Sequence, residues 1–461
     1  MRITVIGTGY LGAVHAAGMA ALGHDVLGVD SDPSKIAALQ QGHAPFFEPG
    51  LPELLHETVA SGRLRFTTSI AQAAAFGEVH FVCVGTPQKA DSDSADMRFV
   101  DAVVAELARG LTPGSLIVGK STVPVGTARR LRELAQELAP TGVDVRVAWN
   151  PEFLREGFAV EDTLSPDRLV FGVDDADSEG ILRAVYSSIL DGGTPSFTTD
   201  LETAELVKVA ANSFLAMKIS FINAMAEVCE TVGADVTTLA DAIGQDARIG
   251  RRFLNAGVGF GGGCLGKDIR AFRARGEELG VGKALEFLGT VDAVNQRRRN
   301  RVLELAAELL GGDVRGRRIT ILGAAFKPNS DDVRDSPALF VARALHDRGA
   351  LVTVHDPAAV ENARRIAPHL SYAQSTVQAS IGAELLVHLT EWDEYRELDP
   401  SILNDLVSAR LVIDGRNQLD VDAWNAAGWS VHALGRAPAP AWNTPSSLDM
   451  AALSAEKEAV A

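Results

Sequence analysis

"RITVIGTGYLGAVHAAGMAALGHDVLGVD", residues 2–30, decides the fold of the first part of this chain. An apolar, β-branched run precedes Gly7, Gly9 and Gly12, which have the spacing G-x-G-x-x-G. A helical stretch and a second apolar run, ending in Asp30, follow. This order is typical of a dinucleotide-binding βαβ unit, although a βαβ turn with no ligand is the alternative. We expect Gly7 to make the tight turn, Gly9 to admit a pyrophosphate, and Gly12 to let helix and strand pack.

Asp30 predicts which dinucleotide binds. A carboxylate at the end of the second strand accepts hydrogen bonds from the adenosine ribose hydroxyls. The same charge repels a 2′-phosphate, so the sequence predicts NAD rather than NADP as the cofactor.

Further strand-like runs at residues 79–87, 115–126 and 145–153 are separated by helical patterns. This alternation predicts a doubly wound parallel sheet, in which ligands bind beyond the carboxyl ends of the strands. Cys83, inside an apolar run, is expected to be a core residue. The polar residues expected at the strand ends are Thr86, Ser121, Thr122 and Glu152.

A second α/β unit begins at "RRITILGAAFKP", residues 317–328, where only Gly323 remains of the glycine fingerprint. We expect a Rossmann-like domain that does not hold a dinucleotide in the same way. The predicted fold is α/β, with two Rossmann-like doubly wound parallel-sheet domains joined by a long central helix and a helical domain. The expected boundaries are 1–200 for the NAD-binding domain, 201–312 for the central helical domain, 313–436 for the second, Rossmann-like domain, and 437–461 for a mobile tail.

Length and composition limit the classes of protein that remain. The 461 residues correspond to about three domains, at roughly 150 residues each. A net charge of -17 argues against a general nucleic-acid or membrane-surface binder. Three cysteines make no disulfide framework, zinc-ligand spacings are absent, and no uninterrupted apolar run could cross a bilayer. The sequence therefore predicts a cytoplasmic protein with no metal site and no membrane segment.

Residues 203–232 contain no proline or glycine and form a predicted helix with two apolar stripes. One stripe consists of Val207, Ala210, Phe214, Met217, Phe221, Met225 and Val228; the other consists of Leu215, Ile219, Ile222, Ala226 and Cys229. Two apolar faces indicate either a domain spine or a dimer seam. Lys208 and Asn212, four residues apart, head the second stripe, and either a ligand or simple snorkelling of the lysine could explain them.

"GVGFGGGCLGKD", residues 257–268, places Cys264 in a glycine-rich loop that is followed by Lys267 and Asp268. Glycine lets a backbone approach a ligand closely, and a thiolate is a strong nucleophile. The cysteine is therefore either a catalytic nucleophile or a free loop thiol.

From Met1 to about residue 435 the chain resembles the UDP-glucose 6-dehydrogenases of the UDP-glucose/GDP-mannose dehydrogenase family. The motifs that carry the resemblance are GTGYLG (7–12), VGTP (84–87), KSTVPVG (120–126), NPEFLREG (150–157), ELVKVAANSFLAMKISFINA (205–224), GFGGGCLGKD (259–268), FKPNSDDVRDSP (326–337) and DGRN (414–417). Their order along the chain is highly specific.

The resemblance implies a two-fold oxidation at C6 of a UDP-sugar, with UDP-glucose as substrate and NAD as the oxidant each time. Cys264 would add to the aldehyde as a thiolate, giving a thiohemiacetal and then a thioester that water hydrolyses. Lys208 would stabilise the developing oxyanion, while Asn212 and Asp268 would orient water or accept a proton. The base of the first step is expected to be Glu152, acting through a water that Thr122 holds.

The resemblance also implies two sets of binding residues and a homodimer. It makes residues 201–312 the dimerisation domain and residues 313–436 the UDP-sugar-binding domain. The NAD set is Gly7, Gly9, Tyr10, Leu11, Gly12, Asp30, Lys35, Thr86, Thr122, Glu156, Lys267 and Arg334. The substrate set is Glu152, Phe153, Leu154, Arg155, Glu156, Lys208, Asn212, Arg248, Phe253, Leu254, Asn255, Ala256, Gly257, Gly261, Phe326, Lys327 and Arg416. Arg416 is similar to an arginine that reaches the sugar nucleotide from the neighbouring subunit.

One departure from the family pattern concerns the nucleophile loop. The family usually reads Cys-Phe-Pro-Lys-Asp, whereas this chain has Leu265 and Gly266 after the cysteine. Two alternatives to UDP-glucose oxidation stay open: a dehydrogenase of GDP-mannose or a UDP-N-acetyl-hexosamine, and a non-catalytic NAD- or UDP-sugar-binding regulator.

Overall fold

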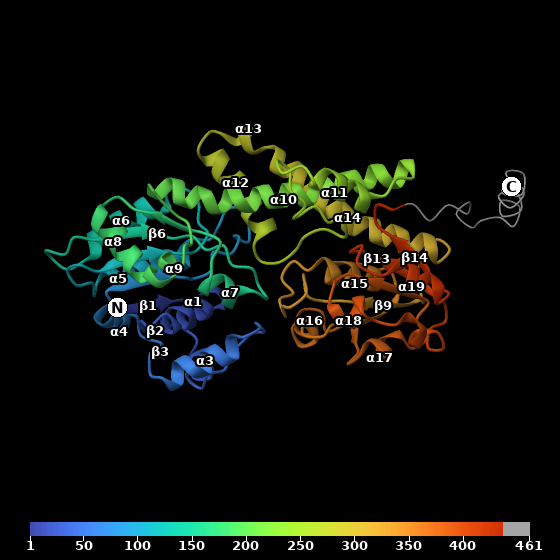
Figure 1. The fold of residues 1–461 in the computed structure, drawn as a ribbon, viewed down its shortest axis with the longest axis horizontal. Coiled ribbons are helices and arrows are strands. Elements are labelled where there is room, and N and C mark those ends of the chain that lie inside the picture. Colours follow the sequence, from blue (N-terminus) through green and yellow to red (C-terminus); the bar gives the residue numbers. More distant parts are fainter. Residues whose placement is uncertain (437–461) are drawn as a thin grey trace, which may run out of the picture.

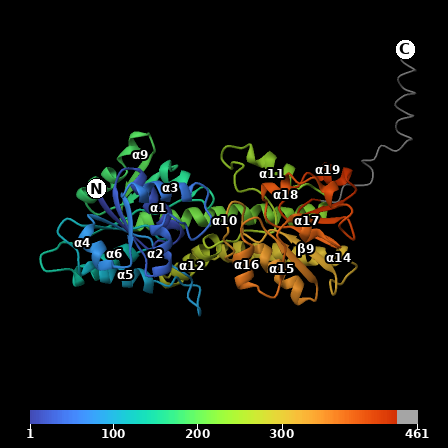
Figure 2. The same cartoon turned by 90° about the horizontal axis from the view of Figure 1, so that it is seen from below.

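The computed structural model describes residues 1–436 of the chain. Two α/β lobes lie side by side, and one long helix, α10 (Leu201–Val232), extends along both of them (Figure 1, and from below in Figure 2). The first expected tail residue, 437, and all that follow it lie outside the described residues.

The first lobe contains an eight-stranded sheet in the order β3-β2-β1-β4-β5-β6-β7-β8. Its strands are β1 (Arg2–Ile6), β2 (Asp25–Val29), β3 (Leu64–Thr67), β4 (Val79–Val82), β5 (Leu116–Gly119), β6 (Arg146–Trp149), β7 (Leu169–Gly172) and β8 (Ser196–Thr199). The pairings from β3 to β6 are parallel, but β6 and β7 pair antiparallel. The last two strands therefore run against the first six, a detail that the expectation of a parallel sheet did not include.

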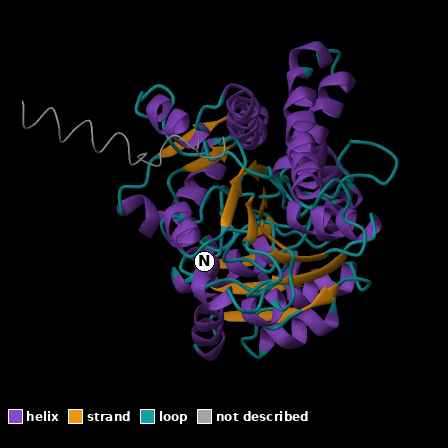
Figure 3. Ribbon diagram, turned by 90° about the vertical axis from the view of Figure 1, so that its right-hand side faces the viewer, coloured by secondary structure: helices purple, strands orange, loops and turns teal. Residues whose placement is uncertain are grey.

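Figure 3 shows helices packed around the strands of the two lobes. The helices of the first lobe cover both faces of its sheet. They are α1 (Tyr10–Ala21), α2 (Pro33–Gln40), α3 (Leu51–Ala60), α4 (Ile70–Phe76), α5 (Arg98–Ala108), α6 (Thr127–Leu138), α7 (Ala159–Leu164), α8 (Ala176–Val185) and α9 (Ser187–Asp191). Two separate apolar cores result, one on each face. Both faces are buried, so β4 and β5 have no exposed residue and are apolar almost throughout. Cys83 lies in one of these cores, as expected.

The central helices begin with α10, which extends the predicted helix by two residues at its start. The Asp200 side chain accepts a hydrogen bond from the Thr203 N–H at 2.7 Å, and Gly233 ends the helix with φ +77°. The other central helices are α11 (Val236–Gly244), α12 (Leu265–Glu278), α13 (Gly282–Leu285) and α14 (Phe287–Leu309). α10 packs against α12 and α14 and contacts β7 of the first lobe.

The two apolar stripes of α10 are covered to different extents. Ile222, Ala226 and Cys229 of the second stripe are buried in a core shared with α11. Met217 and Met225 of the first stripe are partly buried, but Phe214, Phe221 and Val228 are 58%, 49% and 52% exposed. The second stripe therefore packs as a domain spine does, and the exposed residues of the first leave the dimer-seam alternative open.

By length and hydropathy, α10 also meets the criteria for a membrane-spanning helix. Its buried residues include Glu205, Lys208 and Asn212, and it packs against two other helices. These features are those of a core helix that carries polar groups to a site.

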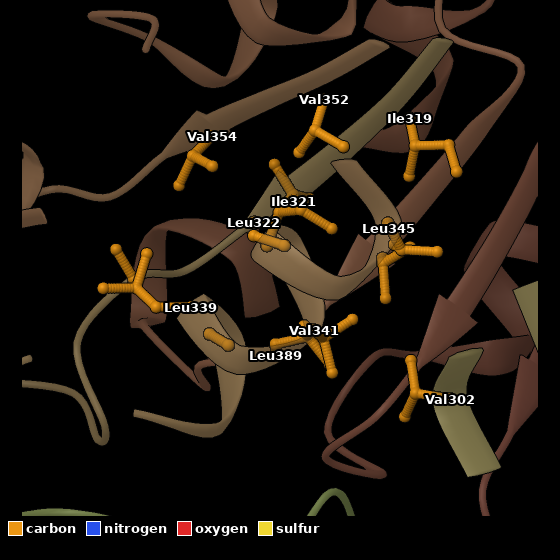
Figure 4. Close-up of a cluster of buried hydrophobic side chains, with 14 of the residues drawn as sticks. Val302, Ile319, Ile321, Leu322, Leu339, Val341, Leu345, Val352, Val354 and Leu389 are labelled. Atoms are coloured by element: carbon orange, nitrogen blue, oxygen red, sulfur yellow. The ribbon is translucent and has the colours of Figure 1, made fainter. Parts of the chain in front are cut away.

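The second lobe contains a six-stranded parallel sheet in the order β11-β10-β9-β12-β13-β14. Its strands are β9 (Arg318–Leu322), β10 (Leu351–His355), β11 (Ser371–Tyr372), β12 (Leu385–His388), β13 (Leu411–Asp414) and β14 (Ser430–Ala433); its helices are α15 (Pro337–Asp347), α16 (Val360–Ile366), α17 (Thr376–Ser380), α18 (Asp393–Arg396), α19 (Val421–Ala426) and the 3₁₀ helix η1 (Pro400–Leu403). Side chains of β9, β10 and α15 interdigitate in its core (Figure 4). Val302 of α14 joins this core and so fixes the lobe to the central helices.

Candidate active site

The glycine turn after β1 has the shape that a dinucleotide pyrophosphate requires. Gly7 has φ +94°, and a Cβ on Gly12 would lie 1.9 Å from the Gly7 carbonyl oxygen. A Cβ on Gly9 would meet nothing within 4 Å, so the space before the first turn of α1 is open. These residues therefore fit NAD, with the amides of a helix N-terminus facing the ligand.

Asp30 lies at the carboxyl end of β2, where the ribose of a dinucleotide is expected. Its carboxylate pairs with Lys35 Nζ at 2.8 Å and accepts a 3.3 Å hydrogen bond from Thr8 Oγ1. The pair holds the carboxylate in place, but it also puts a cation beside it.

Other members of the expected NAD set lie around the same strand ends. Thr86 Oγ1 donates to the Thr122 carbonyl at 2.7 Å, which joins the loops after β4 and β5. Tyr10 is turned away: its hydroxyl bonds to the buried Glu48, and the Gly157 N–H donates to it at 3.1 Å. Leu11 packs on the core behind α1.

Cys264 occupies the position just before α12 and accepts the Asp268 N–H at its carbonyl, at 2.9 Å. Its loop is pressed against the second lobe. A Cβ on Gly261 would lie 2.4 Å from the Asp335 carbonyl, and one on Gly263 would lie 2.6 Å from the Arg334 guanidinium. Only glycine can bring this backbone so close to the second lobe.

Lys208 projects from α10 toward Glu152, which follows β6. Lys208 Nζ lies 3.1 Å from Glu152 Oε1, and both side chains are largely buried. Burial alone would lower the pKa of Lys208, but the charges of Glu152, Cys264 and Asp268 raise it above its ordinary value. The group is therefore a fixed cation at neutral pH. Such a cation can stabilise an oxyanion.

Asn212, one turn further along α10, connects to the nucleophile loop. Its amide donates to Asp268 Oδ2 at 2.7 Å, and Lys267 Nζ lies 2.7 Å from Asp268 Oδ1. Asp268 is only 2% exposed, so two donors satisfy a buried carboxylate. Helix α10 and helix α12 thus hold Lys208, Asn212, Cys264 and Asp268 in one polar network.

The Cys264 thiol is exposed to solvent, yet its pKa is raised to about 11. Desolvation by the surrounding protein is the largest cause, and the carboxylates of Asp268 and Glu152 add to it. Lys208 acts in the opposite direction. In the unliganded site the sulfur is therefore a thiol, and Lys208 is the group that favours its thiolate.

Glu156 and Arg334 join the two lobes beside this network. Arg334 Nη2 lies 3.3 Å from Glu156 Oε1, and Ser330 Oγ donates to Glu156 Oε2 at 3.1 Å. Burial and the neighbouring Asp332 raise the pKa of Glu156 to about 7. Burial also lowers the pKa of Lys327, which the charge of Glu156 partly counteracts.

The substrate loop, residues 257–261, runs along the turn after β13. The Val258 N–H donates to the Gly415 carbonyl at 2.8 Å, and a Cβ on Gly257 would lie 2.5 Å from the same oxygen. Arg416 donates to the carbonyls of Gly259 and Phe326 at 2.9 and 3.2 Å. Its guanidinium is therefore held beside the substrate loop of its own chain. That Arg416 reaches a sugar nucleotide bound at a neighbouring subunit stays a prediction.

Several expected substrate residues contribute backbone or packing rather than free side chains. Arg155 is engaged with Asp162, and Phe153 lies under the Arg168 guanidinium, 3.8 Å from ring centroid to Cζ. Leu254 and Ala256 are buried in the core with α11. Asn255 accepts from Arg251, and Phe253 has a strained φ of +65°.

Arg248 lies apart from these groups. Its side chain is 89% exposed and pairs only with Asp246 within the described residues. No contact in the described chain brings it to the Cys264 network.

Comparison with known proteins agrees with this geometry. The UDP-glucose/GDP-mannose dehydrogenase family matches in three parts: its NAD binding domain at residues 1–190, its central domain at 202–297 and its UDP binding domain at 320–421. The chain belongs to this family. Its reaction class is NAD-dependent oxidation, and NAD is the cofactor of the first lobe.

Individual relatives of this family cover almost the whole chain. A UDP-glucose 6-dehydrogenase of Rhizobium meliloti (strain 1021) is 43% identical over 438 residues, 95% of this chain and 100% of the relative. The solved structure of a UDP-glucose dehydrogenase from Pyrobaculum islandicum is 40% identical with a TM-score of 0.85, covering 92% of this chain and 95% of that one. A UDP-D-ManNAc dehydrogenase structure from Pyrococcus horikoshii is 25% identical with a TM-score of 0.82, covering 95% and 99%.

The departure of this family member after Cys264 leaves the helix start intact. Leu265 and Gly266 form the first turn of α12, and Gly266 is buried. A Cβ at Gly266 would lie 3.3 Å from Arg270 and Asp335 side-chain atoms. Hydrogen bonding of the Asp268 N–H to the Cys264 carbonyl therefore holds the turn without a proline.

Sequence reasoning missed the buried polar residues that shape this dehydrogenase site. Asn223 accepts the Gly257 N–H at 2.9 Å, and Asn295 accepts the Phe260 N–H at 2.8 Å. Glu48 accepts the Gly157 and Ala159 N–H groups at 2.6 and 2.7 Å. For Asn223 the sequence did offer a signal: a single asparagine within an apolar helical stretch. A buried amide needs a hydrogen-bond partner, so such a residue is expected to bind a loop.

The second lobe differs from the first at the position equivalent to Asp30. Asp356, after β10, turns inward and accepts the Ala324 and Ala325 N–H groups at 2.7 and 2.9 Å. In the first lobe the corresponding turn leaves open space. This carboxylate occupies amides that a dinucleotide pyrophosphate would need, in keeping with the expectation that this lobe does not hold a dinucleotide in the same way. Among residues 1–436, no cluster of three or more metal-ligating side chains is present.

Proposed function

We propose that this chain is a UDP-glucose 6-dehydrogenase, which oxidises C6 of UDP-glucose to the carboxylate of UDP-glucuronate in two steps. The observation that carries the proposal is that the charges of Lys208 and Asp268 act on the thiol of Cys264, while Asn212 and Lys267 hold the Asp268 carboxylate. NAD accepts the hydride from C6 in each oxidation. The residues that would hold it are Gly7, Gly9, Gly12, Asp30, Lys35, Thr86, Thr122, Glu156, Lys267 and Arg334.

In the first oxidation, Glu152 takes the proton of the C6 hydroxyl through a water that Thr122 holds. Glu152 Oε1 lies 3.1 Å from Lys208 Nζ, so the proposed base and the cation for the oxyanion face the same point. The ammonium of Lys208 then stabilises the oxygen that gains negative charge as the C6–H bond breaks.

In the second oxidation, Cys264 adds through sulfur to the aldehyde carbon, and the thiol proton passes to the aldehyde oxygen or to a neighbouring base. Loss of hydride from the thiohemiacetal, with its hydroxyl proton, gives a thioester. Water then breaks the C–S bond, returns the thiol and releases the acid. Asp268 and Asn212, joined at 2.7 Å, are placed to orient this water.

In this proposal the substrate lies between the loop of residues 257–261 and the second lobe. Amides of residues 257–261, with Lys327 and Arg416, hold the diphosphate and sugar. Arg248 and Phe253 lie on an exposed loop, where they could reach a ligand bound at a neighbouring subunit. The exposed stripe of Phe214, Phe221 and Val228 supports a homodimer, and the three free cysteines support a reducing, cytoplasmic setting.

A turnover assay with a panel of nucleotide sugars tests the substrate. UDP-glucose is expected to give two NADH per acid formed, with much lower kcat/KM for GDP-mannose and UDP-N-acetyl-hexosamines. Preference for an N-acetylated sugar would show that the substrate assignment is wrong, while the proposed two-step oxidation would still hold. No NADH with any sugar would favour the non-catalytic regulator.

The Cys264→Ala variant tests the covalent step. It is expected to bind NAD and UDP-glucose normally but to oxidise the C6 aldehyde at least about a thousandfold more slowly, since the nucleophile is gone. Cys264→Ser is expected to be nearly as poor, because an alkoxide forms less readily than a thiolate. A wild-type aldehyde rate in Cys264→Ala would disprove the thioester.

A further inference from the structure

Lys120, directly after β5, is a buried lysine without an anionic partner among residues 1–436. Its side chain is 6% exposed, and within this part of the chain its Nζ contacts only neutral groups: Asn150 Oδ1 at 3.0 Å and the Tyr186 hydroxyl at 3.4 Å, with a longer contact to the Asn150 carbonyl. The rings of Phe81 and Tyr186 lie 5.9 Å from it. Burial lowers the pKa of Lys120 to about 8. A buried ammonium without an anionic partner is costly, so this lysine gives up its proton more readily than an exposed one does.

A small cavity adjoins Lys120. It has a volume of about 50 Å³ and is lined by Lys120, His15, Tyr186 and Glu152, among others. This is room for about one or two waters. His15, which is 2% exposed, has no hydrogen-bond partner for Nε2 within the described residues. A polar cavity with an unsatisfied buried nitrogen is the kind that holds ordered water.

The lining of this cavity includes both the first-step base and a residue at the surface. Glu152, which pairs with Lys208 Nζ at 3.1 Å, lines it. Asp167, which is exposed to solvent, also lines it, and we call this part the outer end of the cavity. The same cavity therefore borders Glu152, Lys120 and a solvent-exposed carboxylate.

We propose that Lys120, with the water of this cavity, relays the proton that Glu152 takes from the C6 hydroxyl to solvent at Asp167. The inference rests on the proposed function, in which Glu152 is the base of the first oxidation. The C6 O–H bond breaks and its proton passes to Glu152. Lys120, as the free amine, accepts that proton through the cavity water and then releases it to water at the outer end.

The first oxidation moves a proton from the C6 hydroxyl to Glu152 as the hydride leaves. Onward transfer of that proton to Lys120 makes this step more favourable, so loss of Lys120 slows the first oxidation itself. Lys120 is therefore a positioning and relay residue, which acts on the substrate only through Glu152.

Chemical rescue of Lys120→Ala tests the relay. The first oxidation is measured as the NADH formed in a single turnover of UDP-glucose, and the variant is expected to be about 100-fold slower. Ethylamine, 2-fluoroethylamine and 2,2,2-trifluoroethylamine are then added at matched occupancy. These amines have similar size but different basicity, so the restored rate should follow basicity. The wild-type enzyme with the same amines is the control.

Two outcomes would overturn the relay: a wild-type rate in Lys120→Ala, or equal rescue by all three amines, which would make the lysine a space filler. If Lys120→Ala does not fold, Lys120→Met keeps the length of the side chain. It should keep NAD binding but lose the first oxidation, while oxidation of added C6 aldehyde through Cys264 changes less than threefold. A wild-type first-step rate in Lys120→Met would also overturn the relay.

A parallel Glu152→Gln measurement separates this inference from the proposed function. If Glu152→Gln oxidises UDP-glucose at the wild-type rate, the base assignment itself is wrong. If Glu152→Gln is slow but Lys120→Ala is not, only the relay is wrong.

Discussion

At the scale of single residues, Cys264 is held in balance between groups that raise and lower its pKa. Desolvation and the carboxylates of Asp268 and Glu152 raise it to about 11, against the pull of Lys208. A thiol of this kind is less reactive than a thiolate toward oxidants and alkylating agents.

Alkylation of the unliganded enzyme by iodoacetamide measures this pKa. Only the thiolate reacts, so the rate should rise about tenfold per pH unit from pH 7 to 9.5 with no plateau. Cys83 and Cys229 are buried and should react far more slowly, and Cys264→Ala reports their background. A plateau near pH 8 would show an ordinary thiol and contradict the raised pKa.

The ion pair of Asp30 and Lys35 is expected to determine whether NAD or NADP is the preferred cofactor. The wild-type enzyme should use NAD far better than NADP, because a 2′-phosphate would meet the Asp30 carboxylate. Asp30→Ser should lower kcat/KM for NAD about tenfold or more through the lost ribose hydrogen bonds. It should raise kcat/KM for NADP, because Lys35 loses its 2.8 Å partner and can meet the phosphate.

The double variant Asp30→Ser with Lys35→Ala is the matched control and should lose the gain for NADP. Comparable kcat/KM for both cofactors in the wild-type enzyme would contradict the role of Asp30.

Residue types were easier to predict from the sequence than side-chain directions. Cys264, Lys267 and Asp268 lie within one local motif, so their proximity follows from a single helix turn. Tyr10 and Arg416 are different, because their partners, Glu48 and the Gly259 carbonyl, come from distant parts of the chain. No spacing rule reports such contacts.

At the scale of elements, α10 illustrates both what periodicity predicts and what it leaves open. Its length follows from Asp200 at its start and Gly233 at its end. Its two apolar stripes were visible in the sequence, but which stripe meets the core depends on where α11, α12 and α14 pack. The structure covers the stripe of Ile222 and leaves Phe214, Phe221 and Val228 exposed at seven-residue intervals.

We predict that this stripe is the contact between two subunits. Phe221→Glu should convert a dimer into a monomer at micromolar concentration, because an unpaired carboxylate would be buried at the contact. Light scattering gives the molar mass. Phe99→Glu, at an equally exposed phenylalanine of α5, is the matched control and should remain dimeric. A wild-type enzyme that is already monomeric, or a dimeric Phe221→Glu, would contradict the prediction.

At the scale of the whole molecule, the site depends on how two α/β lobes meet. The order of strands and helices in each lobe could be predicted, since alternating apolar runs and helical patterns leave few arrangements. The reversed direction of β7 and β8 could not be predicted. Of these two strands only β7 pairs with β6, and it does so through a single bridge, Trp149 with Gly172. The contact between the lobes could not be predicted either. A Cβ on Gly157 would lie 2.7 Å from the Asn329 carbonyl oxygen. This close approach exists only when both lobes are folded and packed together.

Glu156 makes this contact between lobes sensitive to pH. Burial raises its pKa from 4.5 to about 7, so the folded protein binds the proton more tightly than the unfolded chain does. Below about pH 4.5 both states are protonated and the group has no net effect. Between pH 4.5 and 7 the unfolded chain ionises first, so folding stability falls as pH rises through this window. Glu205, whose pKa is also raised to about 7 by burial, contributes with the same sign.

Glu156→Gln should therefore raise Tm at pH 8 but change it little at pH 5, since glutamine stays neutral and can still bond to Ser330. Ionising the buried Glu156 costs free energy of folding at pH 8, and each kcal/mol of this cost that the variant removes should raise Tm by about 2–4 °C. The difference in Tm between pH 5 and pH 8 should therefore shrink by several degrees. Thermal unfolding of both proteins across this range measures it. The wild-type slope should not vanish in the variant, because Glu205 still titrates. Glu57→Gln, at an exposed glutamate, is the control and should keep the full wild-type slope. If Glu156→Gln lowers Tm at pH 8, the ionised carboxylate stabilises the lobes through Arg334 at 3.3 Å, and the raised pKa is wrong.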